Sequence, residues 1–111
     1  MTDRVNALEE LKEFCVERRV SWHHVTDIRI FWHRVTAVGS GQIRRIEDIH
    51  LLDFEYDSGY GTQHLYGTVW LSDGTWFERR EYDGSERWMH VKPPNPKDVQ
   101  DYHEHLRKLW S

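Results

Sequence analysis

Two Asp-Gly pairs, Asp73-Gly74 and Asp83-Gly84, constrain the fold of this chain more than any other feature. Each pair separates runs in which apolar and polar residues alternate, and glycine accepts the positive φ angle that a tight turn requires. Asp-Gly in this setting is among the strongest short-range indications of a β-hairpin. We therefore expect three consecutive antiparallel strands, at residues 62–71, 75–82 and 86–91.

The first turn decides which side chains face each other across its hairpin. A two-residue loop at this turn pairs Leu71 with Trp76 and Trp70 with Phe77. In that register, charged residues lie among aromatic rings on both sides of the hairpin. We therefore expect neither face to be cleanly apolar.

The charges beside the second turn predict a longer loop there. A two-residue loop would set Glu81 opposite Glu86, and like charges in direct opposition destabilise a strand pair. A three-residue loop instead pairs Glu81 with Arg87 and Phe77 with Val91. We therefore expect three residues, 83–85, in the second loop.

A helix is expected at each end of the chain. Apolar residues recur at three- and four-residue spacing after Thr2 or Asp3, either of which can cap a helix that runs to Arg18. Near the other end, a Pro-Pro pair stops the last strand. Asn95 follows it and can cap an amphipathic C-terminal helix.

Two further strands are expected between the first helix and the hairpins. Residues 27–38 are dense in Ile, Phe, Trp and Val, and the Gly-Ser-Gly at 39–41 ends this strand. A second strand is expected at residues 46–56, with a turn of helix as the alternative for its first part. The chain therefore predicts one α+β domain over residues 1–111, with an N-terminal helix, an antiparallel meander sheet of about five strands, and a C-terminal helix, both helices packed on one sheet face.

Composition narrows the functional classes. The 111 residues carry a formal net charge of −4, which disfavours a nonspecific phosphate binder. Cys15 is the only cysteine and falls on the apolar stripe of the first helix, which favours a small buried hydrophobe over a reactive thiol. No apolar run has the length of a membrane span, so we expect a cytoplasmic protein without a membrane partner.

Candidate catalytic groups are weakly patterned. Asp53, Glu55 and Asp57 alternate along a predicted strand, so all three point to one face, where they could bind Mg²⁺ or Ca²⁺. The same alternation is typical of the solvent face of a half-buried strand. The serines lie in turns, and the histidines lack a chelating spacing. We therefore predict no catalytic residue, metal or cofactor, and keep a metal-dependent hydrolase as an alternative.

The hairpins offer the better candidate for a functional surface. Trp, Tyr and Arg are the residue types that carry binding hot spots. The alternative is structural, with arginine stems stacked on tryptophan rings. The predicted binding surface consists of Trp70, Trp76, Glu78, Arg80, Tyr82, Asp83, Glu86 and Trp88.

Residues 52–94 resemble a family of small uncharacterised proteins of bacteriophages and other mobile elements. The shared pattern is Asp-Gly-Thr-Trp, then Glu-Tyr-Asp-Gly-Ser-Glu-Trp-Trp, then a proline-containing end. Here Arg87 stands where the first Trp of the final pair is usual. The family has no known activity that could be assigned to this chain. The resemblance implies a small non-enzymatic protein that binds a host protein and inhibits or modulates it, as anti-CRISPR and other anti-defence inhibitors do.

Two other partners are compatible with the sequence. Single-stranded nucleic acid could stack on the same aromatic rings beside Arg79, Arg80 and Arg87. A second copy of the chain could pair with an exposed sheet edge, for which residues 27–38 are the candidate. A protein partner remains the first expectation because the chain is acidic.

Overall fold

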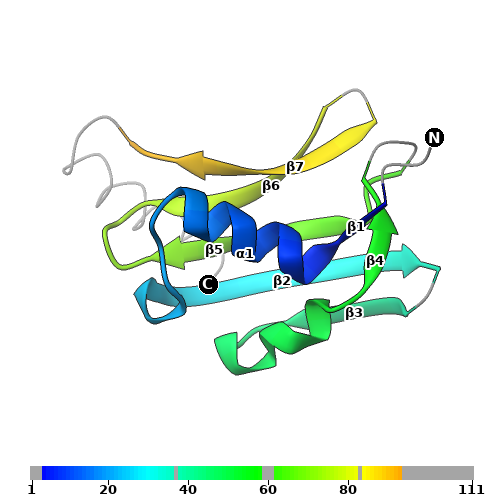
Figure 1. Ribbon diagram of the computed structural model, residues 1–111, viewed down its shortest axis with the longest axis horizontal. Coiled ribbons are helices and arrows are strands. Elements are labelled where there is room, and N and C mark those ends of the chain that lie inside the picture. Colours follow the sequence, from blue (N-terminus) through cyan, green and yellow to red (C-terminus); the bar gives the residue numbers. More distant parts are fainter. Residues whose placement is uncertain (1–3, 37, 59–61, 83, 94–111) are drawn as a thin grey trace, which may run out of the picture.

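The computed structural model describes residues 4–36, 38–58, 62–82 and 84–93. Its main element is a five-stranded antiparallel sheet in the order β3-β2-β5-β6-β7 (Figure 1). The sheet strands are β2 (Val25–Val35), β3 (Gly39–Ile43), β5 (Leu65–Leu71), β6 (Trp76–Tyr82) and β7 (Ser85–Val91). This sheet and the helix that covers it confirm the α+β class.

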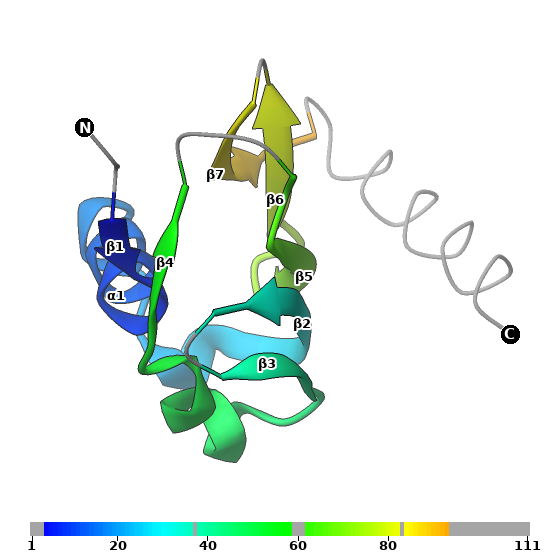
Figure 2. The same ribbon diagram turned by 90° about the vertical axis from the view of Figure 1, so that its right-hand side faces the viewer.

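The helix α1 (Ala7–Glu17) lies on one side of this sheet, which we call the inner face (Figures 1 and 2). On the same side, β1 (Arg4–Asn6) pairs with β4 (Glu55–Asp57) in a second, two-stranded sheet. Two short 3₁₀-helices, η1 (Trp22–His24) and η2 (Ile46–Leu52), precede β2 and β4. The predicted C-terminal helix from Asn95 lies outside the described residues.

The first helix begins later than the sequence indicated. Asn6, rather than Thr2 or Asp3, is its N-cap, and the Asn6 side chain accepts a hydrogen bond from the Glu9 N–H (3.0 Å). The chain before it is extended because Arg4 to Asn6 pair with β4. A local cap and a strand partner from residues 55–57 therefore fix the start of α1.

The core lies between α1 and the inner face. Ile28, Ile30, Val69 and Phe77 are fully buried there, and the Phe14 ring of α1 meets Phe77 edge-on at 4.8 Å. Truncating a buried phenylalanine of this kind costs about 3–5 kcal/mol. Cys15 is also buried, as expected, and burial raises the pKa of its thiol to about 11.

The middle of the chain corrects two strand predictions. The strand expected at residues 27–38 is β2, but it ends at Val35, and Gly39 to Gly41 open the next strand instead of closing this one. The first part of the strand expected at 46–56 is the 3₁₀-helix η2, so the helical alternative is confirmed there. β2 lies between β3 and β5, so it is not a sheet edge.

The β5–β6 hairpin has a three-residue loop, 72–74, where two residues were expected. Val69 pairs with Phe77 and Trp70 with Trp76. Gly74 has a φ of 87°, and Asp73 Oδ1 accepts hydrogen bonds from the N–H (2.9 Å) and hydroxyl (2.6 Å) of Thr75. These contacts close a turn followed by a left-handed glycine, a common three-residue hairpin geometry.

The β6–β7 hairpin is shorter than expected. Tyr82 pairs with Ser85 and Glu81 with Glu86, which leaves two residues in the loop instead of three. The two opposed carboxylates have different partners. Glu81 accepts from the Gly84 N–H (2.7 Å), whereas Glu86 is buried among donors, so their opposition does not leave two unpaired charges.

The observed registers change which side chains share a face. A one-residue shift exchanges the two faces of a strand, because side chains alternate with a period of two. Val69 and Phe77 therefore lie together on the inner face, and Trp70 and Trp76 lie together on the opposite face. The inner face of this hairpin also carries the buried Arg79, and the outer face carries Glu78 and Arg80, so neither face is cleanly apolar, as expected.

Candidate binding face

We call the side of the five-stranded sheet away from α1 the outer face. Strand alternation from the buried inner residues assigns to it five of the eight residues predicted as a binding surface, namely Trp70, Trp76, Glu78, Arg80 and Tyr82. Trp76 is nevertheless buried, with 5% of its surface exposed. Glu86 and Trp88 lie on the inner face and are also buried, with 5% and 4% exposed. Asp83 lies outside the described residues. The structure therefore does not bring the eight residues together.

Glu86 belongs to a buried polar cluster. Its carboxylate accepts hydrogen bonds from Arg79 Nη2 (2.9 Å) and from the backbone N–H groups of His64 (2.7 Å) and Leu65 (3.0 Å). Its own N–H donates to the Ser58 carbonyl (3.0 Å). Glu86 thus holds both sides of the connection between β4 and β5, which gives it a structural role.

Arg79 is the centre of this cluster. Its guanidinium donates to the Tyr56 hydroxyl and forms an ion pair with Glu10 of α1 at 3.1 Å. Trp88 packs beside it, with the ring centroid 5.4 Å from the guanidinium carbon. Burial alone would lower the pKa of Arg79, but Tyr56, Glu10 and Glu86 outweigh it and raise that pKa. Arg79 therefore remains charged and joins α1, β4, β6 and β7.

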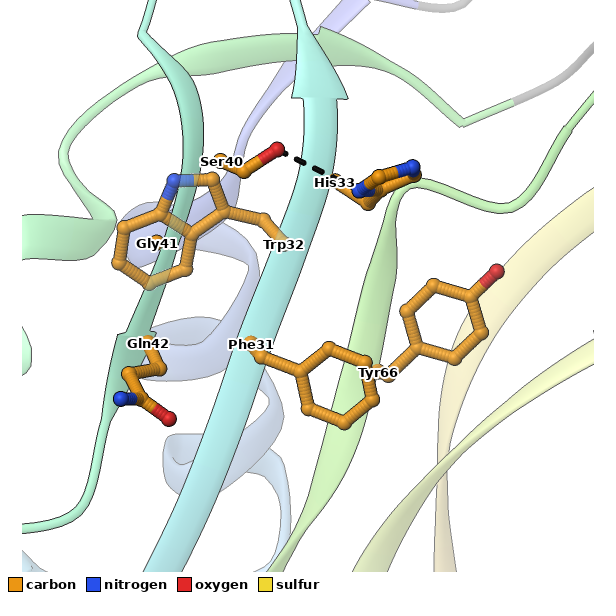
Figure 3. A pocket seen from close by; sticks show the side chains of 7 residues that line it. All are labelled: Phe31, Trp32, His33, Ser40, Gly41, Gln42 and Tyr66. Carbon is orange, nitrogen blue, oxygen red and sulfur yellow. Dashed lines mark hydrogen bonds between the residues drawn. The ribbon is translucent and has the colours of Figure 1, made fainter.

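The most exposed aromatic pair in the middle of the sheet was not among the predicted site residues. Phe31 of β2 is 49% exposed on the outer face, and its ring stacks on Tyr66 of β5 with 4.9 Å between centroids and 5° between planes. Figure 3 shows the two rings on neighbouring strands. The sequence holds a signal for Phe31, because it is out of phase with the buried Ile28, Ile30 and Trp32.

Two shallow hollows flank Phe31, and we call them together the Phe31 groove. The larger, about 540 Å³, is lined by Phe31, Trp32, His33, Ser40, Gly41, Gln42 and Tyr66 (Figure 3). The smaller, about 200 Å³, is lined by Arg29, Ile30, Phe31, Gln42, Ile43, Arg44, Gly67, Thr68 and Trp70. Phe31 and Gln42 line both hollows and separate them.

Glycines shape this part of the sheet. Gly67 has a φ of 147°, and a Cβ atom there would lie 2.3 Å from the Arg29 carbonyl oxygen, so only glycine lets β5 approach β2 so closely. A Cβ atom at Gly41 would lie 2.4 Å from the Trp32 ring. The groove therefore depends on both residues.

The Ser40–His33 pair beside the groove does not form an activated nucleophile. Ser40 Oγ lies 3.4 Å from His33 Nδ1, which is long for a hydrogen bond of this type. The same oxygen accepts a hydrogen bond from the Arg34 N–H at 3.1 Å. These contacts stabilise the turn between β2 and β3 and leave the hydroxyl without a close base.

Of the three carboxylates predicted to align on one strand, Glu55 and Asp57 lie on β4, whereas Asp53 directly follows the 3₁₀-helix η2. Leu52, Phe54 and Tyr56 are buried, whereas Asp53 and Glu55 between them are exposed. Asp53 accepts a hydrogen bond from the Asn6 amide at 2.9 Å. Within the described residues, no three His, Cys, Asp or Glu side chains gather as a metal site would require.

Comparisons with known proteins identified no relative of this chain. No family model, curated protein or solved structure matches this chain. Among the helices of the described part, none combines the length and the apolar composition needed to cross a membrane.

Proposed function

We propose that this chain is a small non-enzymatic binding protein that attaches to a host protein through its outer face. The observation that carries the proposal is the exposed Phe31 ring stacked on Tyr66 in the central strands. Large apolar rings held rigidly on an open surface favour association, because they bury area at little cost in side-chain entropy. The resemblance to phage and mobile-element proteins suggests that binding inhibits or modulates the host protein.

The shape of the face favours binding of a protein over catalysis on a small molecule. The Phe31 groove is shallow, whereas small-molecule sites enclose most of their ligand. The polar residues around it form local structural contacts, such as those of Ser40. A broad face with exposed rings and mixed polar groups matches the composition of protein interfaces.

Single-stranded nucleic acid is the second candidate, since a stacked aromatic pair is also a platform for bases. Two observations favour a protein. The chain carries a net charge of −4, and Glu78 on the outer face pairs with Arg80 at 2.8 Å. Carboxylates beside a phosphate backbone would weaken such binding.

A photo-crosslinking amino acid at position 31 tests the proposal. The matched control places the same amino acid at position 16, because Val16 is 76% exposed on α1, an element of the opposite side. Each variant is expressed in the bacterial host, irradiated, and analysed by gel electrophoresis and mass spectrometry. We expect a discrete protein adduct from position 31 that is absent from position 16.

The adduct also separates the two candidates. A position-31 adduct that nuclease treatment removes supports nucleic acid in place of a protein. Identical adduct patterns from positions 31 and 16 contradict the assignment of the outer face.

A further inference from the structure

We infer that the Phe31 groove takes an extended segment of the partner protein in which a carboxylate and an apolar side chain lie two residues apart. This inference rests on the proposed function and specifies what the outer face recognises. It follows from three features of the groove: an apolar hollow, a cation beside it, and the separation between them.

The apolar anchor has a place beside Phe31. The larger hollow brings together the exposed Phe31 ring, the Tyr66 ring stacked on it and the β3 residues Gly41 and Gln42. Its volume of about 540 Å³ exceeds the size of a single side chain, and its open form admits one from above. An aromatic or branched apolar side chain would there cover rings that water now contacts.

The cation is Arg44, which directly follows the last residue of β3. It is exposed and lines the smaller hollow. The residues that line the two hollows include Arg29 and Arg44 but no carboxylate, although the chain as a whole is acidic. Arg29 already has an interaction within the chain, so Arg44 is the cation that we assign to the carboxylate. Its guanidinium matches a carboxylate in shape and charge.

The spacing follows from strand geometry. Gln42 is the partner of Phe31 across the β2–β3 pair, and Arg44 lies two residues beyond Gln42. Two residues of extended chain span about 7 Å, and side chains two apart point the same way. An extended segment along β3 would therefore place its apolar side chain at Phe31 and its next side chain on that face at Arg44.

The neighbouring strand permits this approach. β3 ends the strand order of the five-stranded sheet, and Gly39–Ile43 contains no charged residue and no proline. Charged residues and prolines are the usual means by which an edge strand repels an extended chain.

Short synthetic peptides test the inference by NMR titration of the ¹⁵N-labelled full chain. The probe has the sequence Gly-Ser-Phe-Ser-Glu-Ser-Gly, with blocked termini. One control moves Phe next to Glu, a second replaces Glu by Lys, and a third is a thymidine oligonucleotide. We expect the probe to shift amide signals of β2 and β3 around Phe31 and to bind about two- to fivefold more tightly than either control peptide.

Variants of the protein make the test specific. Arg44→Gln should remove the preference for Glu over Lys, and the adjacent Arg45→Gln should retain it, because Arg45 lines neither hollow and lies 3.6 Å from Asp48. Equal binding of the Glu and Lys peptides at Phe31 overturns this inference and leaves the proposed function standing. Tighter binding of the oligonucleotide there replaces the protein partner with nucleic acid. No shift on the outer face with any probe contradicts both.

Discussion

Arg79 and Glu86 form a buried ion pair, with 2.9 Å between Nη2 and Oε1, that connects the last hairpin to the rest of the domain. Their side chains are 0% and 3% exposed. The pair explains why the β6–β7 hairpin adopts a register in which Glu81 and Glu86 are opposed. It also explains why Glu86, a residue predicted to bind a partner, serves the fold.

Glu86→Ala should therefore destabilise the domain strongly. The substitution leaves Arg79 without its closest counter-charge and two backbone N–H groups, of His64 and Leu65, without an acceptor. We expect a loss of about 3–5 kcal/mol in the free energy of unfolding, measured by urea denaturation. Arg87→Ala, at the exposed neighbouring position, should change the free energy of unfolding by no more than about 0.5 kcal/mol. Equal losses in the two variants would contradict the role of the pair.

Tyr56 should ionise later than the other tyrosines. Burial raises the pKa of its phenol above the usual range, and the nearby Glu10 raises it further against the opposing effect of Arg79. Because the folded-state pKa is raised, the stabilisation by Tyr56 is complete below about pH 10 and is lost at higher pH, where the unfolded chain releases this proton. Absorbance at alkaline pH should show one of the five tyrosines ionising only as the chain unfolds. A Tyr56→Phe variant that keeps the delayed ionisation would disprove the assignment.

His90 should make stability depend on acid pH. Burial lowers the pKa of His90, with a further contribution from Lys92, against the raising effect of Asp73. The unfolded chain therefore takes up this proton first, so the stabilisation is present above about pH 6.5 and is lost as pH falls below that value. The difference in Tm between pH 8 and pH 5.5 should be smaller in His90→Gln than in the wild type. If the Tm difference in His90→Gln equals that of the wild type, His90 does not cause the pH dependence.

Gly67→Ala should weaken the contact between β2 and β5. The added Cβ atom meets the Arg29 carbonyl at 2.3 Å, in a backbone conformation that already favours glycine. We expect the free energy of unfolding to fall by the cost of the strained φ angle and by about 1–3 kcal/mol more from overpacking. Gly39→Ala is the control, because Gly39 also has a positive φ but its Cβ atom would meet nothing within 4 Å. Equal thermal stability of the two variants would refute the close approach.

The hairpins could be predicted from the sequence because their signals are local. Asp-Gly turns and alternating residues placed β5, β6 and β7 within a few residues of their observed bounds. The lengths of the two hairpin loops could not be predicted from the sequence, because they depend on contacts with residues far away in the chain. Glu86 tolerates its position opposite Glu81 because its donors come from Arg79, His64 and Leu65, which the charge rule for neighbouring strands does not consider.

For the candidate site too, local sequence signals were informative and contacts between distant residues were not. Residue type indicates Trp70, Trp76 and Tyr82 as surface candidates, and all three lie on the outer face, but Trp76 is buried there. Phe31 is absent from the predicted surface because that prediction considers the hairpins alone, whereas Phe31 lies on β2, which neighbours β5 in the sheet. Burial of Trp88 depends on Arg79 across the strand pair, a contact that no spacing in the sequence reveals.

The affinity of the crosslinked partner for two variants shows whether the outer face is the binding surface. Phe31→Ser removes the exposed ring, and Val16→Ser changes a residue of greater exposure on α1. Isothermal calorimetry should show binding weakened about 30-fold or more by Phe31→Ser, the loss expected at a hot spot of about 2 kcal/mol, and unchanged by Val16→Ser. Equal affinities of the two variants, each with wild-type Tm, would show that the partner does not bind through Phe31 on the outer face.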